Sequence, residues 1–282
     1  MVTAAFVHPA PPNPPELPEG VTLRPRWRAW TSVAALFSAL VAATILGAVL
    51  YIASGVSNFD DAPAGISIAA TVLQDACFVG AAILYAGMTS RPRPAQFGLR
   101  PARFWWAVLW VFAGYLTFLL FSGIWLSIIG VHQRDSLPDD LGANQSTAAL
   151  IAVMLLVTVI APLAEEFFFR GYFFTALRGW LGLWGAAVVT GLFFGAIHVG
   201  SAPVGYLVPL AFFGFVLCLV YWRTGSLVPC IALHALNNSL AFGVSQHWDW
   251  QIPVLAAGAL CVLAVVLLPL VRGASMPRRL VA

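Results

Sequence analysis

Charged residues are scarce in this chain of 282 residues, and lysine is absent altogether. Charged side chains make up 9% of the sequence, whereas 61% of the residues are hydrophobic. A water-soluble domain normally has about 25% charged residues. Several apolar runs reach about 20 residues, the length that an α-helix needs to cross the hydrocarbon of a bilayer. The composition therefore excludes an ordinary soluble domain and predicts an all-α, polytopic membrane protein.

Cysteine motifs are also missing, and no removable leader is expected. The four cysteines stand singly in apolar segments without C-x-x-C spacing, which favours packing over redox chemistry. The N-terminus lacks the ordered basic, apolar and small-residue regions of a signal peptide. It is instead rich in proline and poor in large apolar residues. We therefore predict a flexible tail over 1–28, a membrane-embedded domain over 29–272 and a second tail over 273–282.

Hydrophobic segments predict a transmembrane helical bundle of about eight helices. The predicted segments are Trp30–Ala53, Gly65–Met88, Phe104–Gly130, Thr147–Leu177, Gly182–Val199, Val204–Trp222, Leu227–Val244 and Ile252–Val271.

The positions of the arginines predict the orientation of this bundle. With eight crossings and the N-terminus inside, every arginine except Arg134 and the intramembrane Arg170 falls on the cytoplasmic side. We therefore expect a multi-pass protein of the cell membrane with both termini in the cytoplasm. The net charge of +3 then reflects topology in a lipid bilayer, and no nucleic-acid partner is expected.

Two adjacent glutamates and an arginine lie inside the fourth segment, in the stretch APLAEEFFFRG (161–171). An ionisable group in the middle of a membrane helix costs about 3 kcal/mol on insertion scales, so it indicates a functional site unless it only pins two helices together. At about 100° per residue, Glu166 and Arg170 share a helix face and are expected to pair, whereas Glu165 points elsewhere. An unpaired, buried Glu165 is suited to act as a general base.

Polar residues also interrupt two later segments. His198 ends the stretch GLFFGAIH, and ALHALNNS contains His234 and, one helical turn later, Asn238. One histidine in an apolar helix is more often a hydrogen-bonded core residue than a ligand, but these polar groups come from separate segments. At ~1.5 Å per residue, the four groups lie roughly 13 to 24 Å from the cytoplasmic ends of their segments. We therefore expect Glu165, His198, His234 and Asn238 to meet near mid-membrane.

The length of the fourth helix and one glycine pair add two expectations. From 147 to 178 a straight helix would measure ~48 Å, longer than a bilayer is thick, so it must tilt, bend near Gly171 or enter a cavity. Gly191 and Gly195 form a G-x-x-x-G spacing that permits a close contact between helices.

Taken in order, these motifs resemble those of the CAAX protease and bacteriocin-processing (CPBP, Abi) membrane endopeptidases, the family that includes the Ras-converting prenyl proteases. The motifs are E-E-x-x-x-R at 165–170, F-x-x-x-H at 194–198 and H-x-x-x-N at 234–238, and they cover about a quarter of the chain. The resemblance implies intramembrane hydrolysis of a peptide bond, and eight membrane segments suit the family.

The resemblance also implies roles for the motif residues. Glu165 and His198 would activate the attacking water, and His234 and Asn238 would hold the oxyanion. The supporting residues would be Glu166, Arg170 and Phe194. The family is often classed as metalloendopeptidases, and Glu165, His198 and His234 are a known type of zinc ligand set. Because the chain has no H-E-x-x-H, and an amide is an unusual zinc ligand, zinc and a metal-free mechanism both stay open.

Two other functions compete with a membrane protease. The first is a non-catalytic scaffold or bacteriocin-immunity factor of the same fold, which has no reason to keep Glu165 unpaired. The second is a proton-coupled transporter, but the two halves of the chain show no matching broken helices. The expected partner is a membrane-associated peptide or protein substrate. The arginine- and alanine-rich composition suggests a GC-rich bacterial genome, where prenylated substrates are not expected.

Overall fold

The computed structural model describes residues 25, 27–56, 62–130 and 136–274, and the regular secondary structure in these ranges is helical. The proline-rich stretch and the C-terminal tail predicted from the sequence lie outside these ranges, apart from a few residues next to the bundle. The same holds for the charged residues of 57–61 and 131–135, which entered the prediction of topology.

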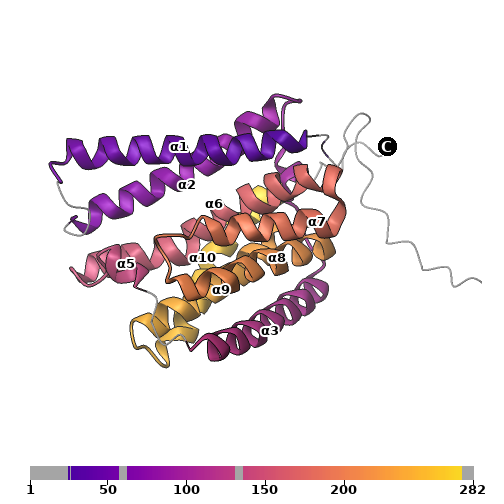
Figure 1. The fold of residues 1–282 in the computed structure, drawn as a ribbon. Helices are drawn as coiled ribbons and strands as arrows, with labels where there is room; N and C mark the ends of the chain where they lie inside the picture. The colour runs from indigo at the N-terminus through magenta and orange to yellow at the C-terminus, as the bar shows by residue number, and fades with distance from the viewer. Residues whose placement is uncertain (1–24, 26, 57–61, 131–135, 275–282) are drawn as a thin grey trace, which may run out of the picture.

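The described helices run in one direction and then the other through a single bundle (Figure 1). The long helices are α1 (Ala29–Ala53), α2 (Ala64–Gly87), α3 (Phe104–Ile129), α7 (Thr175–Ala196), α8 (Leu207–Thr224), α9 (Leu227–Ser245) and α10 (Gln251–Ala274). The helix that leads into α7 consists of α5 (Thr147–Leu155), the π-helix η3 (Leu156–Ile160), α6 (Ala161–Glu166) and the π-helix η4 (Phe167–Phe174). Three short helices lie between the long ones: η2 (Pro94–Phe97), α4 (Leu137–Asp140) and η5 (Val204–Tyr206).

Within the described ranges, seven helices are long and apolar enough to span a membrane, one fewer than the eight predicted segments. The difference arises because Thr147–Ala196 counts as one helix of 50 residues. This helix is broken at Gly182, where φ is 66° and ψ is −171°, a conformation that only glycine adopts readily. The chain turns back there at one end of the bundle (Figure 1), so it crosses the bundle eight times, as predicted. The reversal at Gly182 lies at the start of the predicted segment Gly182–Val199, and at Gly171 the fourth helix continues in π geometry.

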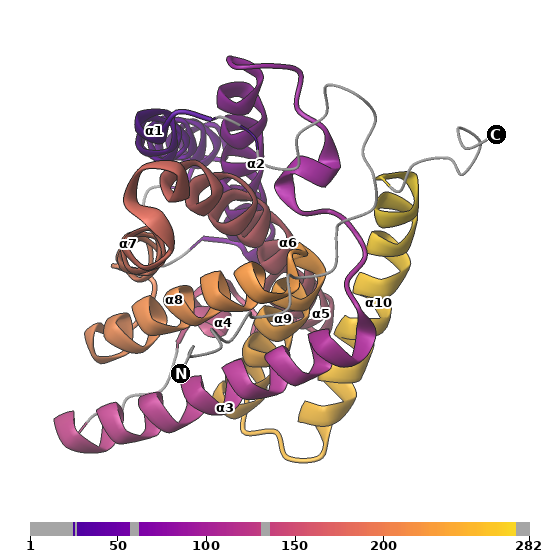
Figure 2. The same ribbon diagram turned by 90° about the vertical axis from the view of Figure 1, so that its right-hand side faces the viewer.

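The helices divide into an inner and an outer group. Viewed along the bundle, α6 and α9 lie in the middle, and the other helices surround them (Figure 2). The apolar part of α9 is 56% buried, whereas those of α1 and α3 are only 17% and 11% buried. Their exposed apolar side chains therefore face the lipid, and the polar groups of α6 and α9 are kept inside the protein.

The predicted close contact at Gly191 and Gly195 lies between α7 and α8. A Cβ atom added to Gly191 would stand 2.6 Å from the carbonyl oxygen of Ala211, and one added to Gly195 would stand 2.7 Å from that of Leu207. Only glycine permits the two backbones to approach this closely. The prediction from the G-x-x-x-G spacing is confirmed, and this contact holds the end of α7 that carries His198.

Part of the predicted N-terminal tail belongs to the bundle. The Trp27 side chain is only 5% exposed, and its ring packs 4.9 Å from that of Phe97 and 5.1 Å from that of Tyr172. The Tyr172 hydroxyl donates to Thr31 Oγ1 over 2.9 Å. Trp27, one residue before the predicted boundary at residue 28, therefore contributes to the aromatic core.

Candidate active site

The two glutamates lie on α6, between two π-helical stretches. Pro162 in the first turn of α6 has no backbone N–H, so it cannot donate a hydrogen bond to the preceding turn. That turn, Leu156–Ile160, is widened to π geometry. In a π-turn the donor for the carbonyl of Val157 would come from residue 162, five positions ahead, and here it is proline. The Asn238 side chain on α9 supplies the missing donor, because its Nδ2 donates to Val157 O over 2.9 Å.

The predicted ion pair between Glu166 and Arg170 is present. Arg170 Nη1 donates to Glu166 Oε1 over 2.7 Å, and both side chains are 0% exposed. The guanidinium also donates from Nη2 to the carbonyl of Gly214 on α8 over 3.0 Å. Its central carbon lies 4.5 Å from the centroid of the Phe194 ring, within the range of a cation–π contact. Arg170 thus connects η4 with α7 and α8.

Glu166 has a second partner that the sequence analysis did not predict. His234 Nδ1 lies 2.8 Å from Glu166 Oε1. Because a carboxylate oxygen accepts, Nδ1 carries the hydrogen in this bond, and the other ring nitrogen, Nε2, points to the neighbouring glutamate. One buried carboxylate therefore binds the arginine on its own helix and the histidine on α9.

Glu165 is free of Arg170. Its side chain is 13% exposed, and its Oε2 atom is buried without a hydrogen-bond partner among the described residues. The side chain of His234 is close by, with its Nε2 4.0 Å from Glu165 Oε2. This distance is too long for a hydrogen bond, but it is short enough for one water molecule to contact both atoms. The four polar groups Glu165, Glu166, Arg170 and His234 thus form one buried cluster.

His198 stands beside this cluster without bonding to it. It follows the end of α7 in a tight turn, and its Nδ1 lies 2.7 Å from the carbonyl oxygen of Phe194. The Phe194 ring separates the two histidines, with centroids 5.1 Å from the His198 ring and 5.7 Å from the His234 ring. In the part of the chain that the structure describes, no hydrogen bond or ion pair joins His198 to either glutamate. The geometry therefore brings Glu165 and Glu166 of α6 next to His234 of α9, whereas the Phe194 ring lies between His198 and this cluster.

The candidate zinc ligands are Glu165, His198 and His234. Nowhere in the described ranges do three histidine, cysteine or acidic side chains group as a metal ion requires. His234 uses Nδ1 for Glu166, and His198 uses Nδ1 for the Phe194 carbonyl, so each ring has only Nε2 left. Glu165 and His234 approach each other, but His198 does not complete the set. The three residues do not fit a metal site as they stand here.

Asp75 is the buried carboxylate that the sequence analysis missed. It lies in the middle of α2, is 4% exposed, and its buried Oδ2 has no hydrogen-bond partner among the described residues. It is close enough to Glu165 for the two carboxylates to interact electrostatically. The signal was present, because Asp75 is the one charged residue of the predicted segment Gly65–Met88. The rule that singled out Glu165 applies equally to Asp75.

Comparison with known proteins identifies the segment that carries the site. Residues 147–240 match the family model described as type II CAAX prenyl endopeptidase, Rce1-like. The match runs from α5 through most of α9 and contains every motif residue, so it confirms the resemblance predicted from the motifs. An uncharacterised 24.3 kDa protein of Escherichia coli is 32% identical over 108 residues, which are 36% of this chain and 49% of that protein. This chain thus spans about half the length of that curated relative. No solved structure gives a significant match.

Proposed function

We propose that this protein is an intramembrane endopeptidase that hydrolyses a peptide bond of a membrane-associated peptide or protein. The observation that carries the proposal is the buried Oε2 of Glu165, which has no hydrogen-bond partner among the described residues and lies 4.0 Å from His234 Nε2. A carboxylate at membrane depth is costly unless it has a task, and a poised general base is such a task. The family match over residues 147–240 supports the same reaction class.

Glu165 is the proposed base. It takes one proton from a bound water, and the water oxygen forms a bond with the carbonyl carbon of the substrate. The electrons of the carbonyl double bond move to its oxygen, which becomes the oxyanion. When the intermediate collapses, the bond between carbon and nitrogen breaks, and Glu165 returns its proton to the leaving amine. Only Glu165 changes its proton count in this scheme, so the Glu166 and Arg170 pair stays intact throughout.

His234 and Asn238 are the proposed oxyanion donors. Asn238 uses one N–H for the Val157 carbonyl and has a second N–H to donate. His234 donates to Glu166 through Nδ1, so it also donates through Nε2 only when both ring nitrogens carry a proton. Glu166 is then the counter-ion of the protonated His234 ring as well as of Arg170. Donors that are fixed in place before the reaction stabilise an oxyanion most strongly where water is excluded.

His198 is proposed to act with Glu165 on the water, as the family resemblance implies. Its Nδ1 faces the Phe194 carbonyl, so Nε2 is the nitrogen available to the reaction. The ring packs on Phe194, which in turn packs on Arg170 and His234. A substrate or a water must therefore occupy the space between His198 and Glu165 before the two act together.

We propose that the protein lies in the cell membrane, with both termini in the cytoplasm.

Hydrolysis of an internally quenched library of apolar peptides tests the proposal, with the purified protein in lipid vesicles. Glu165→Gln is expected to lower turnover by about 100- to 10,000-fold, the usual contribution of a general base. Asp249→Asn removes an exposed carboxylate far from the site and is the matched control. A Glu165→Gln variant that cleaves as fast as the Asp249→Asn variant would refute the proposal. Inactivity of both variants and the parent protein, with normal folding, would favour a scaffold.

The proposed mechanism uses side chains alone and requires no metal ion, which can be tested separately. A strong chelator is expected to leave turnover unchanged, and elemental analysis of the purified protein should find no stoichiometric metal. A stoichiometric zinc ion that disappears in the His198→Ala variant would contradict the metal-free mechanism and would restore the ligand set Glu165, His198 and His234.

A further inference from the structure

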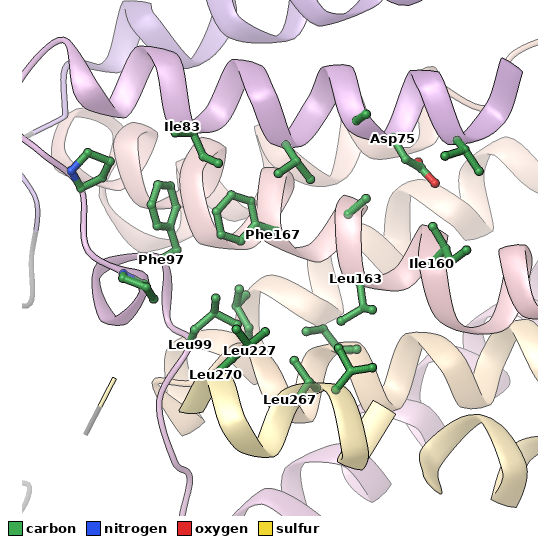
Figure 3. A pocket seen from close by; sticks show the side chains of 18 residues that line it. Asp75, Ile83, Phe97, Leu99, Ile160, Leu163, Phe167, Leu227, Leu267 and Leu270 are labelled. Carbon is green, nitrogen blue, oxygen red and sulfur yellow. The ribbon is translucent and has the colours of Figure 1, made fainter. Parts of the chain in front are cut away.

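A large apolar cavity lies beside the candidate active site. Its volume is ≈ 650 Å³, and it is bounded by α2, η2, η3, α6, η4, α9 and α10 (Figure 3). Phe97, Leu99 and Leu270 lie at one end, and Asp75 and Ile160 lie at the other. Every lining residue is apolar except Asp75. The wall also includes Ala164, which precedes Glu165 in α6, and Asp75, which is close enough to Glu165 for the two carboxyl groups to interact electrostatically, so the cavity lies next to the proposed base.

The cavity is reached from the side of the bundle that faces lipid. Several of its lining residues are exposed, and three of them are Ile83 on α2 and Leu270 on α10, each 48% exposed, and Ile160, which is 40% exposed. All three belong to the apolar helices that span the membrane. An occupant that enters between α2 and α10 therefore comes from the hydrocarbon.

Asp75 makes this cavity more than an apolar groove. Its side chain reaches from α2 toward α6 at the end of the cavity near Ile160 (Figure 3). The residue is 4% exposed, and its buried Oδ2 has no hydrogen-bond partner in the described ranges. Leaving a buried carboxylate oxygen unpaired is costly, and the cost disappears when a ligand brings a donor. An occupant with an N–H group therefore fits the cavity better than a lipid chain, which has no donor.

An extended peptide has that chemistry. Hydrolysis requires the peptide backbone around the scissile bond to be free of helical structure, so its N–H groups lose their partners. In hydrocarbon each unsatisfied backbone N–H costs several kcal/mol. A carboxyl oxygen that accepts a hydrogen bond from one of these N–H groups removes this cost and fixes the register of the substrate peptide. The apolar walls meanwhile accommodate apolar side chains next to Glu165.

We propose that Asp75 is a substrate-binding residue, whose carboxylate accepts a hydrogen bond from a backbone N–H of an extended apolar peptide that enters the cavity from the bilayer. This inference rests on the proposed function, because it places the peptide beside Glu165. It adds a residue outside the three sequence motifs and outside the matched segment 147–240. It also assigns recognition to the backbone of the substrate, so that a broad range of apolar sequences is accepted.

The test uses one internally quenched apolar peptide that the parent protein cleaves, together with analogues in which a single backbone amide is N-methylated. Asp75→Leu is expected to lower kcat/KM by about 10-fold, the value of one lost hydrogen bond in a buried site. Asp75→Asn keeps an acceptor oxygen of the same shape and is expected to lose less than Asp75→Leu. Gln74→Leu makes a similar change at the neighbouring exposed position, which does not line the cavity, and is expected to cleave normally.

N-methylation separates a binding role from a structural one. At one position near the scissile bond, N-methylation should slow cleavage by the parent protein, yet it should cause no further loss in Asp75→Leu. Equal losses in both proteins at every position would overturn the proposal, and so would normal cleavage by Asp75→Leu. Should Asp75→Leu fail to fold, the same comparison is made with Asp75→Asn, where the N-methyl effect is expected to shrink.

A binding measurement keeps this inference separate from the proposed function. The Glu165→Gln protein, with and without Asp75→Leu, is titrated with an apolar peptide that carries a fluorescent label. Weaker binding of about 10-fold or more in the double variant supports Asp75 as a binding residue, even where no peptide is cleaved. Unchanged peptide binding refutes the role of Asp75 and leaves the role of Glu165 untouched. Binding of a labelled lipid, but not of the labelled peptide, would also count against the proposal.

Discussion

The buried network around Glu166 makes the sharpest prediction about stability. In the Glu166→Gln variant, the side chain keeps one oxygen but loses its charge, so Arg170 becomes a buried cation without a counter-ion. Removing one partner of a buried ion pair typically costs about 3–5 kcal/mol. Glu166 Oε1 is also 2.8 Å from His234 Nδ1, so the change weakens a second charge-assisted bond. We expect a loss of folding stability at the upper end of this range.

A double-mutant cycle isolates the pair. Arg170→Gln removes the cation but leaves the carbonyl of Gly214 without its donor, at a cost of about 1–3 kcal/mol. Glu166→Gln combined with Arg170→Gln should therefore be more stable than the sum of the single losses predicts, by about 3 kcal/mol, yet less stable than the parent protein. The Gly214 contact explains why the double variant does not recover fully.

The free energy of unfolding is measured by denaturant titration in detergent micelles, and abundance in the membrane gives a second readout. Asp249→Asn combined with Arg103→Gln provides the matched cycle, since both of these charged residues are exposed. Their coupling energy should be close to zero. A coupling energy near zero for Glu166 and Arg170 as well would refute the argument that the pair holds the site together.

Three further predictions follow from the backbone and the topology. Asn238→Ala should lower both stability, by about 1–3 kcal/mol, and turnover, whereas adding Pro162→Ala should restore the stability alone, because residue 162 then donates to Val157 O. Gly182→Ala should cost about 1–3 kcal/mol in a denaturant titration, because its φ is 66°, while Gly179→Ala, which meets nothing within 4 Å, should cost little. A reporter active only in the cytoplasm should work when fused to the C-terminus and fail when inserted at α4.

The features predicted from the sequence depend on local spacing. The eight crossings follow from the lengths of apolar runs, and the pair of Glu166 and Arg170 follows from the four-residue spacing on one helix. The break at Gly182 coincides with the start of the predicted segment Gly182–Val199, and glycine tolerates the backbone conformation that the break requires. The bond between Glu166 and His234 joins residues 68 positions apart, and only the packing of α9 against α6 decides it. The spacing of residues in the sequence alone does not predict such a contact.

Asp75 shows a different limit. The rule that a charged residue inside a membrane segment indicates function was applied to the fourth segment, where two glutamates and an arginine stand together, and not to the second, where one aspartate stands alone. A lone carboxylate gives no partner to reason about within its own helix. Its neighbour Glu165 comes from α6, and the two become related only when α2 packs beside α6.

The π-turn before α6 shows how the backbone itself makes Asn238 necessary. Pro162 leaves the carbonyl of Val157 without the donor that a π-turn would supply, and a bare carbonyl oxygen inside a membrane protein is costly. Asn238 donates to that oxygen and thereby ties α9 to the helix of the two glutamates. The same side chain is the proposed oxyanion donor, so its loss affects both the position of Glu165 and the reaction. A slow Asn238→Ala variant therefore indicates an oxyanion role only if it stays slow after Pro162→Ala has restored the stability of the fold.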